Sequence, residues 1–249
     1  MSPTCGRFSI VLSFIVVRAS STYKVITPIS TVPLLNCNAL LFDLDGVLVD
    51  SNPVYETHWL IWAQERDVSY QHILEVHHGR PVSDTIRVVA PHLDPITEAE
   101  AYRQSVIADN HLERVRSFPG VSTMLKELPP DRWAIVTSAP RAFALKTLHY
   151  LDLPMPKVFV SSEDIGVGKP APYPYLRAAW GLNQSIEDCI VVEDAPAGIQ
   201  SAKAAGARII AVQTTNSPDV LHEADFLVNE VSDLTIVFSG SNLKVTLDL

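Results

Sequence analysis

The feature that most constrains the fold is an alternation of short apolar runs with helical segments along the second half of the chain. The expected strands are Ala39–Leu44, Trp133–Thr137, Lys157–Val160, Asp188–Val192, Arg208–Val212 and Asp225–Val228. The expected helices are Val121–Leu128, Arg141–Tyr150, Tyr173–Trp180 and Pro196–Ala205, the last of which ends at Gly206, a favoured residue after a helix. Strands that alternate with helices predict a parallel, Rossmann-like α/β sheet with helices on both faces.

The segment from residue 53 to residue 117 has a different pattern, with helical spacing and no convincing strand. Thr97 and Glu100 resemble a capping box that opens a helix running to about Arg114. We therefore expect an α-helical cap at 53–117, inserted into a core formed by 37–52 and 118–249, with 1–36 as an N-terminal extension.

Composition narrows the classes of partner. The 249 residues are 47% apolar and 19% charged, which is typical of a globular protein. A formal net charge of −9 argues against nucleic acid and anionic membranes as partners but allows a small anionic substrate. The three cysteines are scattered, so they predict neither a disulfide framework nor a zinc site. We expect a monomer in a reducing compartment, the cytoplasm.

The N-terminal extension leaves alternatives open. Residues 8–17 form a nearly continuous apolar run between Arg7 and Arg18, too short to span a bilayer, and no acid precedes Asp43. The run could belong to a secretory signal cleaved near Ala19, to a mitochondrial transit peptide, or to a loosely ordered extension without a targeting role.

Chemically capable residues follow the expected strands. Asp43 and Asp45 end the first strand, Ser138 follows the second, Lys169 lies in the loop after the third, and Glu193 with Asp194 ends the fourth. Ligands of open α/β sheets bind outside the carboxyl ends of the strands, so these side chains should meet at one edge. Individually, the acids could close turns or cap helices, Ser138 could cap the next helix, and Lys169 could be a solvated loop charge.

Four carboxylates at one edge repel each other unless a cation joins them, and Mg²⁺ prefers oxygen ligands. The predicted metal ligands are Asp43, the main-chain carbonyl of Asp45, Asp194, and Glu193 directly or through water. In this interpretation Asp43 attacks phosphorus and Asp45 acts as general acid and then base. Ser138 and Lys169 bind phosphoryl oxygens.

Four motifs in this order resemble those of the haloacid dehalogenase (HAD) superfamily, in its phosphatase branch. They are DLDGVLVDS from Asp43, VTSA with Ser138, GVGKPAPYPYL with Lys169, and VVEDAPAGIQSAKAAGA with Glu193 and Asp194. The resemblance covers about 38–228 and implies a magnesium-dependent hydrolase of phosphoric monoesters with a mobile cap.

Within that superfamily, the chain is most similar to fungal 2-deoxyglucose-6-phosphate and glycerol-phosphate phosphatases. The segments that carry this likeness are HHGRPVSDTI, APHLD, DRWAIVTS and EDAPAGI. It implies a small phosphorylated sugar or polyol as substrate. Ser138-Ala139-Pro140 departs from the Ser-Gly of the compared family member, which alters the phosphate loop.

Two other functions stay open, a phosphomutase and a non-catalytic binding protein on the same fold. Related β-phosphoglucomutases carry a histidine in the first cap helix where this chain has Tyr55, although His58 is one turn away. A dehalogenase is disfavoured because such enzymes lack the second aspartate, Asp45.

Cap residues are assigned less sharply. Arg80 is a candidate for binding a substrate oxygen or phosphate, and Tyr55 or His58 could face the pocket. The pair His77 and His78 is interpreted as structural or solvent-facing, and Tyr173 and Tyr175 are interpreted as packing residues.

Overall fold

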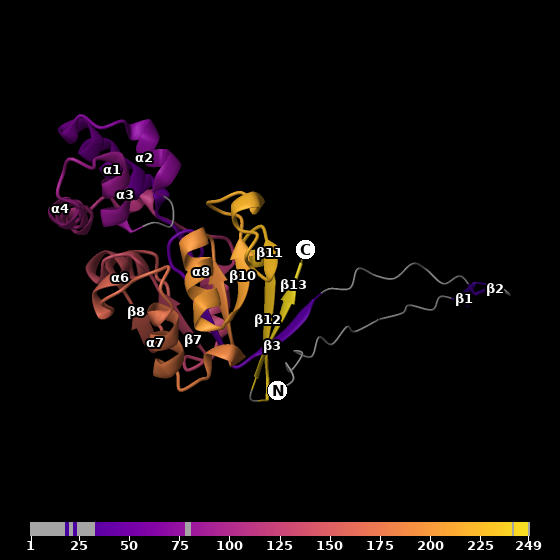
Figure 1. Ribbon diagram of the computed structural model, residues 1–249. Helices are drawn as coiled ribbons and strands as arrows, with labels where there is room; N and C mark the ends of the chain where they lie inside the picture. Colours follow the sequence, from indigo (N-terminus) through magenta and orange to yellow (C-terminus); the bar gives the residue numbers. More distant parts are fainter. Residues whose placement is uncertain (1–17, 20–21, 24–32, 78–80, 241, 249) are drawn as a thin grey trace, which may run out of the picture.

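The computed structural model describes residues 18–19, 22–23, 33–77, 81–240 and 242–248 (Figure 1). The apolar run at 8–17 and the candidate Arg80 therefore lie outside the described residues. Before residue 33, two short strands, β1 (Arg18–Ala19) and β2 (Thr22–Tyr23), pair antiparallel. In the described part of the chain, no helix is both long enough and apolar enough to cross a membrane.

The centre of the molecule is a six-stranded parallel sheet, ordered β11-β10-β9-β4-β7-β8. Its strands are β4 (Ala39–Phe42), β7 (Trp133–Val136), β8 (Val158–Val160), β9 (Cys189–Glu193), β10 (Arg208–Val212) and β11 (Phe226–Val228). The predicted Rossmann-like α/β fold is confirmed. Because β4 lies between β9 and β7, the first expected strand occupies the middle of the sheet.

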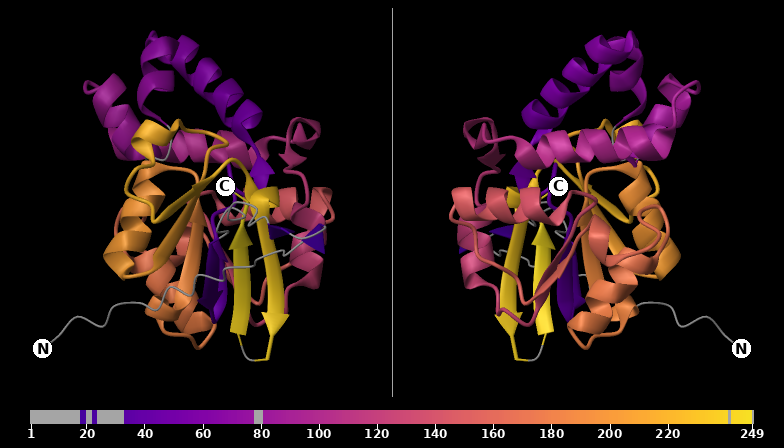
Figure 2. Two further views of the ribbon diagram at one scale, coloured as in Figure 1. Left: turned by 90° about the vertical axis from the view of Figure 1, so that its right-hand side faces the viewer. Right: turned by 90° about the vertical axis from the view of Figure 1, so that its left-hand side faces the viewer.

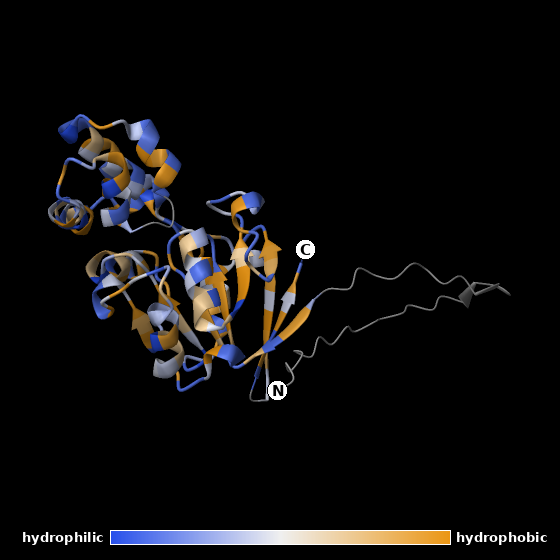
Figure 3. Cartoon of the chain, in the orientation of Figure 1, coloured by the Kyte–Doolittle hydropathy of each residue, from blue (hydrophilic) through white to orange (hydrophobic). Residues whose placement is uncertain are grey.

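Strand alternation explains why both faces of this sheet need cover. Leu40 and Phe42 join one apolar cluster and Ala39 and Leu41 join the other, since successive side chains point to opposite faces. The second cluster includes residues of α7 (Tyr173–Gly181) and α8 (Pro196–Ala205), and the first includes residues of α5 (Val121–Glu127) and α6 (Arg141–Tyr150). Strands buried on both faces are continuously apolar, as the hydropathy colours show (Figure 3).

A second sheet, absent from the sequence predictions, packs on the same face as α5 and α6. It is antiparallel and has the order β12-β13-β3, from β12 (Leu234–Ser239), β13 (Asn242–Leu247) and β3 (Leu34–Cys37). The first residues of β3 lie in the segment assigned to the extension. The core therefore starts before residue 37, because β3 completes this sheet and buries Leu35.

The helical cap consists of α1 (Asn52–Arg66), α2 (Tyr70–Val76), α3 (Val82–Val89) and α4 (Pro95–Ala108). Figures 1 and 2 show it stacked over one end of the sheet. The expected capping box at Thr97 was wrong. Helix α4 starts earlier, because the Asp94 side chain accepts from the Thr97 amide and Pro95 occupies the first turn. The helix also ends at Ala108, before the predicted Arg114.

Two short strands join the cap to the core, β5 (Val49–Asp50) and β6 (Arg116–Ser117), paired antiparallel. The expectation of no strand in 53–117 therefore fails at β6. Its two residues are too short a run to leave a period in the sequence. The remaining regular elements are the 3₁₀ helices Leu112–Arg114, Ser162–Asp164, Ile186–Asp188, Pro218–Val220 and Val231–Asp233.

The cap contacts the core through helix α6. The ring of Tyr55 in α1 meets the ring of Phe143 edge-on, with 5.6 Å between centroids. Lys146 donates from Nζ to the carbonyl oxygens of Ile107 at 3.1 Å and Asp109 at 2.8 Å, just after α4. These contacts hold α1 and the segment after α4 against α6, the helix that follows β7.

Two tryptophans test this assignment of the core. Trp133 in β7 is 1% exposed and packs edge-on against Phe42, whereas Trp180 in α7 is 82% exposed. We expect Trp133→Ala to lower the free energy of unfolding by about 3–5 kcal/mol. Trp180→Ala, the matched control, should change it by less than about 0.5 kcal/mol. Urea denaturation followed by circular dichroism measures both, and equal losses would contradict the assignment.

Candidate active site

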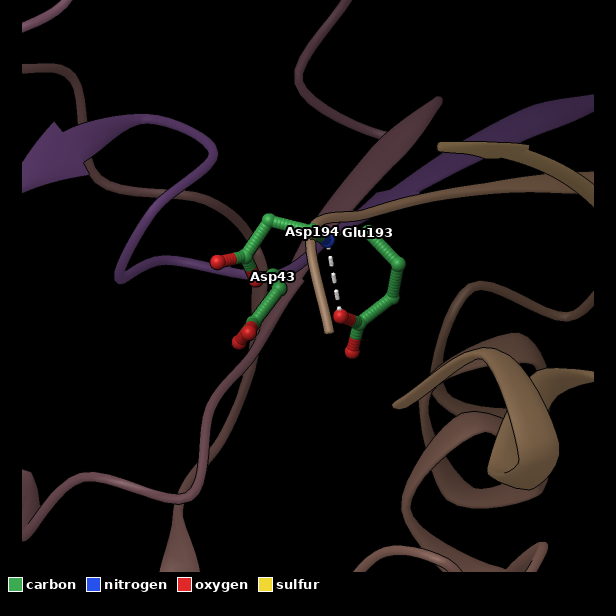
Figure 4. A group of neighbouring side chains, drawn as sticks. All are labelled: Asp43, Glu193 and Asp194. Carbon is green, nitrogen blue, oxygen red and sulfur yellow. Dashed lines mark hydrogen bonds between the residues drawn. The ribbon is translucent and has the colours of Figure 1, made fainter. Parts of the chain in front are cut away.

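The predicted residues meet at the carboxyl ends of three adjacent strands, β9, β4 and β7. Asp43 follows β4 directly, Ser138 lies just past β7, and Glu193 is the last residue of β9. The amide of Asp43 donates to the Val192 carbonyl at 3.0 Å, which continues the parallel ladder to the edge. In Figure 4 the carboxylates of Asp43 and Asp194 point to one side and that of Glu193 to the other.

Lys169 lies between the carboxylates of Asp43 and Glu193. Its Nζ is 3.0 Å from Asp43 Oδ1 and 2.7 Å from Glu193 Oε1, and it donates to the Val136 carbonyl at 3.0 Å. The lysine is 6% exposed. Burial lowers the pKa of Lys169, but the two carboxylates more than offset this effect, so its pKa is raised and the ammonium stays charged.

Glu193 is fully buried and accepts four hydrogen bonds. Oε1 accepts from Lys169 and from the Tyr175 hydroxyl at 2.6 Å. Oε2 accepts from the amides of Asp194 at 3.0 Å and Ala195 at 3.2 Å. A glycine leaves room for this carboxylate, because a Cβ on Gly198 would lie 1.6 Å from Glu193 Oε1. These four donors and the space left by Gly198 thus fix the direction of Glu193.

Asp194 lies against the turn that follows the first motif. Gly46 has a φ of +78°, and a Cβ on it would lie 2.0 Å from Asp194 Oδ2. Glycine is therefore required there both for the backbone conformation and for space. Asn216 donates to the Asp194 carbonyl at 3.1 Å, so the loop after β10 supports the same residue.

The acids form a group that fits a divalent cation. One oxygen from each of Asp43, Glu193 and Asp194 lies within 4.8 Å of the others. Burial raises the pKa of Asp43 well above its usual range despite Lys169, and burial and Glu193 raise the pKa of Asp194 to about 7. These three carboxylates carry more negative charge than Lys169 balances. A hard divalent cation prefers such oxygen ligands and would relieve the remaining repulsion.

Asp45 is held by two hydroxyls. Ser51 donates to Oδ1 and Thr137 donates to Oδ2 at 3.2 Å, while the Thr137 oxygen accepts from the Ala139 amide at 2.9 Å. Burial raises the pKa of Asp45, although these hydrogen bonds act against it. The raised pKa favours the protonated form that a general acid needs. Sequence reasoning missed Ser51 and Thr137, although both belong to the quoted motifs.

Ser138 is exposed, next to the buried Thr137. It does not cap α6, since that helix has Pro140 at its N-cap and no side-chain capping bond. The first amide of α6, that of Arg141, donates to Glu163 at 2.9 Å. Ser138 is therefore left facing outward at the same sheet edge as Asp43.

The three tyrosines named in the sequence analysis have different surroundings. Tyr175 is fully buried, as a packing residue should be, but its hydroxyl binds Glu193. Tyr173 is 56% exposed, so its interpretation as a packing residue was wrong. The Tyr55 hydroxyl is buried and lacks a hydrogen-bond partner among the residues the structure describes. Burial and the charge of Asp45 raise the Tyr55 pKa, so this hydroxyl stays protonated.

His58 forms its side-chain contacts within the cap. Its Nε2 lies 2.8 Å from Asp109 Oδ2 and its Nδ1 lies 3.0 Å from Ser105 Oγ, so both ring nitrogens are engaged. His77 is 9% exposed and packs against Trp59, in line with a structural role. Neither histidine takes the place of a catalytic cap histidine.

One edge of this Rossmann-like fold, beneath the cap, thus holds a buried lysine between two carboxylates, a third acid, and an aspartate held by two hydroxyls. The sequence model for the haloacid dehalogenase-like hydrolases matches residues 40–212. The chain belongs to this family. The resemblance read from the four motifs is therefore confirmed.

Curated relatives of high similarity are phosphatases. Hexitol phosphatase A of Escherichia coli is 35% identical over 205 residues, which cover 81% of this chain and 95% of the relative. Glycerol-1-phosphate phosphohydrolase 2 of Saccharomyces cerevisiae is 35% identical over 208 residues, covering 78% and 82%. These relatives confirm the predicted enzyme class, a phosphoric monoester hydrolase of the HAD type.

A solved structure of β-phosphoglucomutase from Clostridium difficile has the same fold. Its TM-score is 0.65 at 21% identity, over 80% of this chain and 93% of that chain. Similarity at this level of identity concerns the fold alone. The side chains of the site must therefore decide between hydrolysis and transfer.

The repulsion among the acids should make stability depend on pH, which can be used to test the candidate metal site. Burial and the charge of Glu193 raise the pKa of folded Asp194 to about 7, from the 3.8 of an ordinary aspartate. Between these values the folded state holds the extra proton, so the stability contributed by this group falls as pH rises. We expect metal-free Asp194→Asn to gain thermal stability relative to wild type between pH 5 and pH 8.

Mg²⁺ should reverse this order, because it binds the wild-type acids and not the depleted cluster. Differential scanning fluorimetry across pH, with and without Mg²⁺, measures both effects. Asp219→Asn, in the exposed turn after β10, is the control and should follow wild type. An Asp194→Asn variant that Mg²⁺ stabilises as much as wild type would contradict the site.

Proposed function

We propose that this enzyme is a magnesium-dependent phosphatase that hydrolyses small sugar or polyol phosphate monoesters through an aspartyl-phosphate on Asp43. The observation that carries the proposal is the position of Asp43, between Lys169 at 3.0 Å and the acid of Asp194 at the open edge of the sheet. A carboxylate beside an ammonium and a cation site can approach a phosphate dianion without net repulsion.

In the first step, an Asp43 oxygen forms a bond to phosphorus as the bond to the leaving oxygen breaks. Asp45 gives its proton to that oxygen, so the alcohol leaves neutral. In the second step, the Asp45 carboxylate takes a proton from water, whose oxygen attacks phosphorus as the bond between phosphorus and the Asp43 oxygen breaks. Inorganic phosphate leaves, and Asp43 and Asp45 return to their starting forms. Ser51 and Thr137 hold Asp45 for both transfers.

The metal would be held by Asp43, the main-chain carbonyl of Asp45 and Asp194. When bound, Mg²⁺ neutralises charge on the phosphoryl oxygens and on Asp43. Glu193 belongs to the predicted metal group, and its four hydrogen bonds support contact through water over direct ligation. Lys169 and Ser138 are assigned to the phosphoryl oxygens, the former from its buried position and the latter from the exposed edge.

The class of substrate follows from the relatives and from the cap. Of the two phosphatases reported above, one is named for hexitols and the other for glycerol 1-phosphate, and both names point to small polyols. Tyr55 in the cap offers a buried hydroxyl close enough to Asp45 for the charge of that carboxylate to help raise the Tyr55 pKa. A hydroxyl donor beside the acid suits a substrate with several hydroxyls. Arg80, the other predicted substrate contact, stays a prediction.

The alternative, a phosphomutase, requires that the phosphoryl group return to a second hydroxyl of the sugar. The position compared with the mutase histidine holds Tyr55, and His58 is bound to Asp109 and Ser105. A base at that place is therefore missing from α1. The non-catalytic alternative would need a lost nucleophile, acid or lysine, and all three are present at the site.

Phosphate release by the purified full chain tests the proposal. The panel contains hexitol phosphates, glycerol phosphates, 2-deoxyglucose 6-phosphate, hexose and pentose phosphates, and β-glucose 1-phosphate, each with and without Mg²⁺. We expect Mg²⁺-dependent release from small sugar or polyol phosphates. Conversion of β-glucose 1-phosphate to the 6-phosphate without release would support the mutase, and silence from folded protein would contradict both.

Removal of the nucleophile or the lysine should separate two contributions to the rate. Asp43→Asn should abolish turnover, because an amide does not attack phosphorus. Lys169→Ala should lower kcat/KM by roughly 10²–10³-fold, the scale for one lost electrostatic group. Steady-state kinetics measure both, and melting temperatures identify a variant that is merely unfolded. Full activity in Asp43→Asn would refute the mechanism.

The Tyr55 hydroxyl should affect binding of the organic part of the substrate. Tyr55→Phe keeps the ring contact with Phe143 and removes only the oxygen. We expect KM for the best sugar or polyol phosphate to rise about 5- to 50-fold, the cost of one lost hydrogen bond. For p-nitrophenyl phosphate, whose leaving group has no hydroxyls, the two enzymes should be alike. Equal effects on both substrates would contradict a contact with sugar hydroxyls.

Three predictions about the surroundings of the enzyme stay predictions. They are a monomeric state, no binding to nucleic acid, and a cytoplasmic location, with secretion or mitochondrial import by residues 1–36 as the alternatives. The buried thiols of Cys37 and Cys189 are both free, in keeping with a reducing compartment.

A further inference from the structure

We propose that Tyr175 is a positioning residue of this enzyme, whose hydroxyl fixes Glu193 as the anchor of Lys169 and keeps that carboxylate out of the metal shell. The inference rests on the proposed phosphatase function and adds to it a residue outside the predicted set. Among the described residues, Tyr175 forms no hydrogen bond with Asp43 or Asp194, and its hydroxyl donates to Glu193.

Strand alternation brings Glu193 and Tyr175 together on one face of the sheet. In β9, Cys189 and Val191 belong to the apolar cluster under α7 and α8, so Glu193 points to the same side. Tyr175, in the first turns of α7, belongs to that cluster as well. The tyrosine ring therefore packs in the core while its hydroxyl reaches the sheet edge.

The hydrogen-bond capacity of Glu193 is used up by this arrangement. A carboxylate offers about four acceptor positions, and here each oxygen accepts two hydrogen bonds. The Tyr175 hydroxyl occupies one of the two positions on Oε1, at 2.6 Å. A cation could reach Glu193 directly only by displacing one of these donors.

Lys169 is likewise surrounded by oxygen atoms, two of which accept its hydrogen bonds. An ammonium has three N–H groups, and Nζ has three oxygen neighbours, Val136 O, Asp43 Oδ1 and Glu193 Oε1. Nζ also lies 5.2 Å from the centroid of the Tyr175 ring, within range of a cation–π contact. Tyr175 therefore holds Lys169 twice, through its ring and through the carboxylate that its hydroxyl fixes.

This arrangement has a consequence for the reaction. With two acceptors fixed by the protein, the Lys169 ammonium is held as an ion pair 3.0 Å from Asp43 Oδ1, in the carboxylate proposed to attack phosphorus. Its charge is then in place before phosphate arrives, and no reorganisation is needed during attack. Without the Tyr175 hydroxyl, Glu193 Oε1 accepts one hydrogen bond instead of two. Glu193 can then turn toward other partners, and Lys169 moves with it.

Tyr175→Phe tests the inference, with Tyr173→Phe as the matched control. The two tyrosines lie two residues apart in α7, but Tyr173 is 56% exposed and has no part in the site. We expect Tyr175→Phe to lower kcat about 5- to 50-fold, with KM and the half-saturating Mg²⁺ concentration within twofold of wild type. Tyr173→Phe should match wild type in all three, and both variants should melt within a few degrees of it.

Three kinetic outcomes would overturn the inference. Unchanged kcat in Tyr175→Phe would show that the hydroxyl is only a packing feature. A tenfold change in the Mg²⁺ half-saturation would place Glu193 in the metal shell. A large fall in melting temperature with kcat restored at low temperature would show a structural role alone.

A second measurement does not depend on turnover. In metal-free protein labelled with ¹⁵N-lysine, the buried ammonium of Lys169, assigned with Lys169→Arg, should give a protected NMR signal in wild type and in Tyr173→Phe. Tyr175→Phe should broaden or shift it. If wild type hydrolyses nothing while this change occurs, the proposed function fails and the positioning of Lys169 stands. If the signal is unchanged, the positioning role fails.

Discussion

The ion pairing of one buried lysine with two carboxylates is the interaction on which the rest of the site depends. Asp43 and Glu193 end neighbouring parallel strands, so the sheet forces them together whatever their charges. Lys169, 6% exposed, lies between them and compensates part of that repulsion. Buried charges are tolerated only when they are paired and hydrogen-bonded, and removal of one partner leaves the others uncompensated.

The surrounding fold is arranged to keep these charges supplied with partners. Two backbone amides and a tyrosine hydroxyl complete the shell of Glu193. Gly46 and Gly198 give the acids space that any side chain would fill, since a Cβ at either position would overlap a carboxylate oxygen. The negative charge that Lys169 does not balance lies on Asp43 and Asp194. A site that is strained without a cation is thereby prepared to hold one, at some cost in stability.

The division of labour between core and cap follows from the topology. The core supplies the charged groups, which must be rigid to stabilise a developing transition state. The cap is joined by the short pair β5 and β6 and rests on α6 through Tyr55 and Lys146. In the proposed mechanism the cap opens and closes, which excludes water during attack on phosphorus. That proposal assigns recognition of the leaving group to α1 and not to the sheet.

The sequence by itself determined the fold class and where the chemistry lies. Apolar runs alternating with helices specify a parallel sheet, and the ends of its strands must share an edge, so Asp43, Lys169 and Glu193 could be grouped before any coordinates. Helices α6 and α8 and strand β10 were predicted to the residue, because their boundaries coincide with Pro140, Pro196 and Gly206, which act locally.

Tertiary structure decided what local patterns do not encode. In the sheet formed by β3, β12 and β13, the pairing of β3 with β13 joins residues about two hundred positions apart, so no short-range signal could reveal that pairing. The hydroxyl of Tyr175 and the engagement of His58 by Asp109 depend on side-chain direction across packed elements. That Glu193 pairs with Lys169 while Asp194 points to the other side was likewise decided by the pleat of the chain at the end of β9.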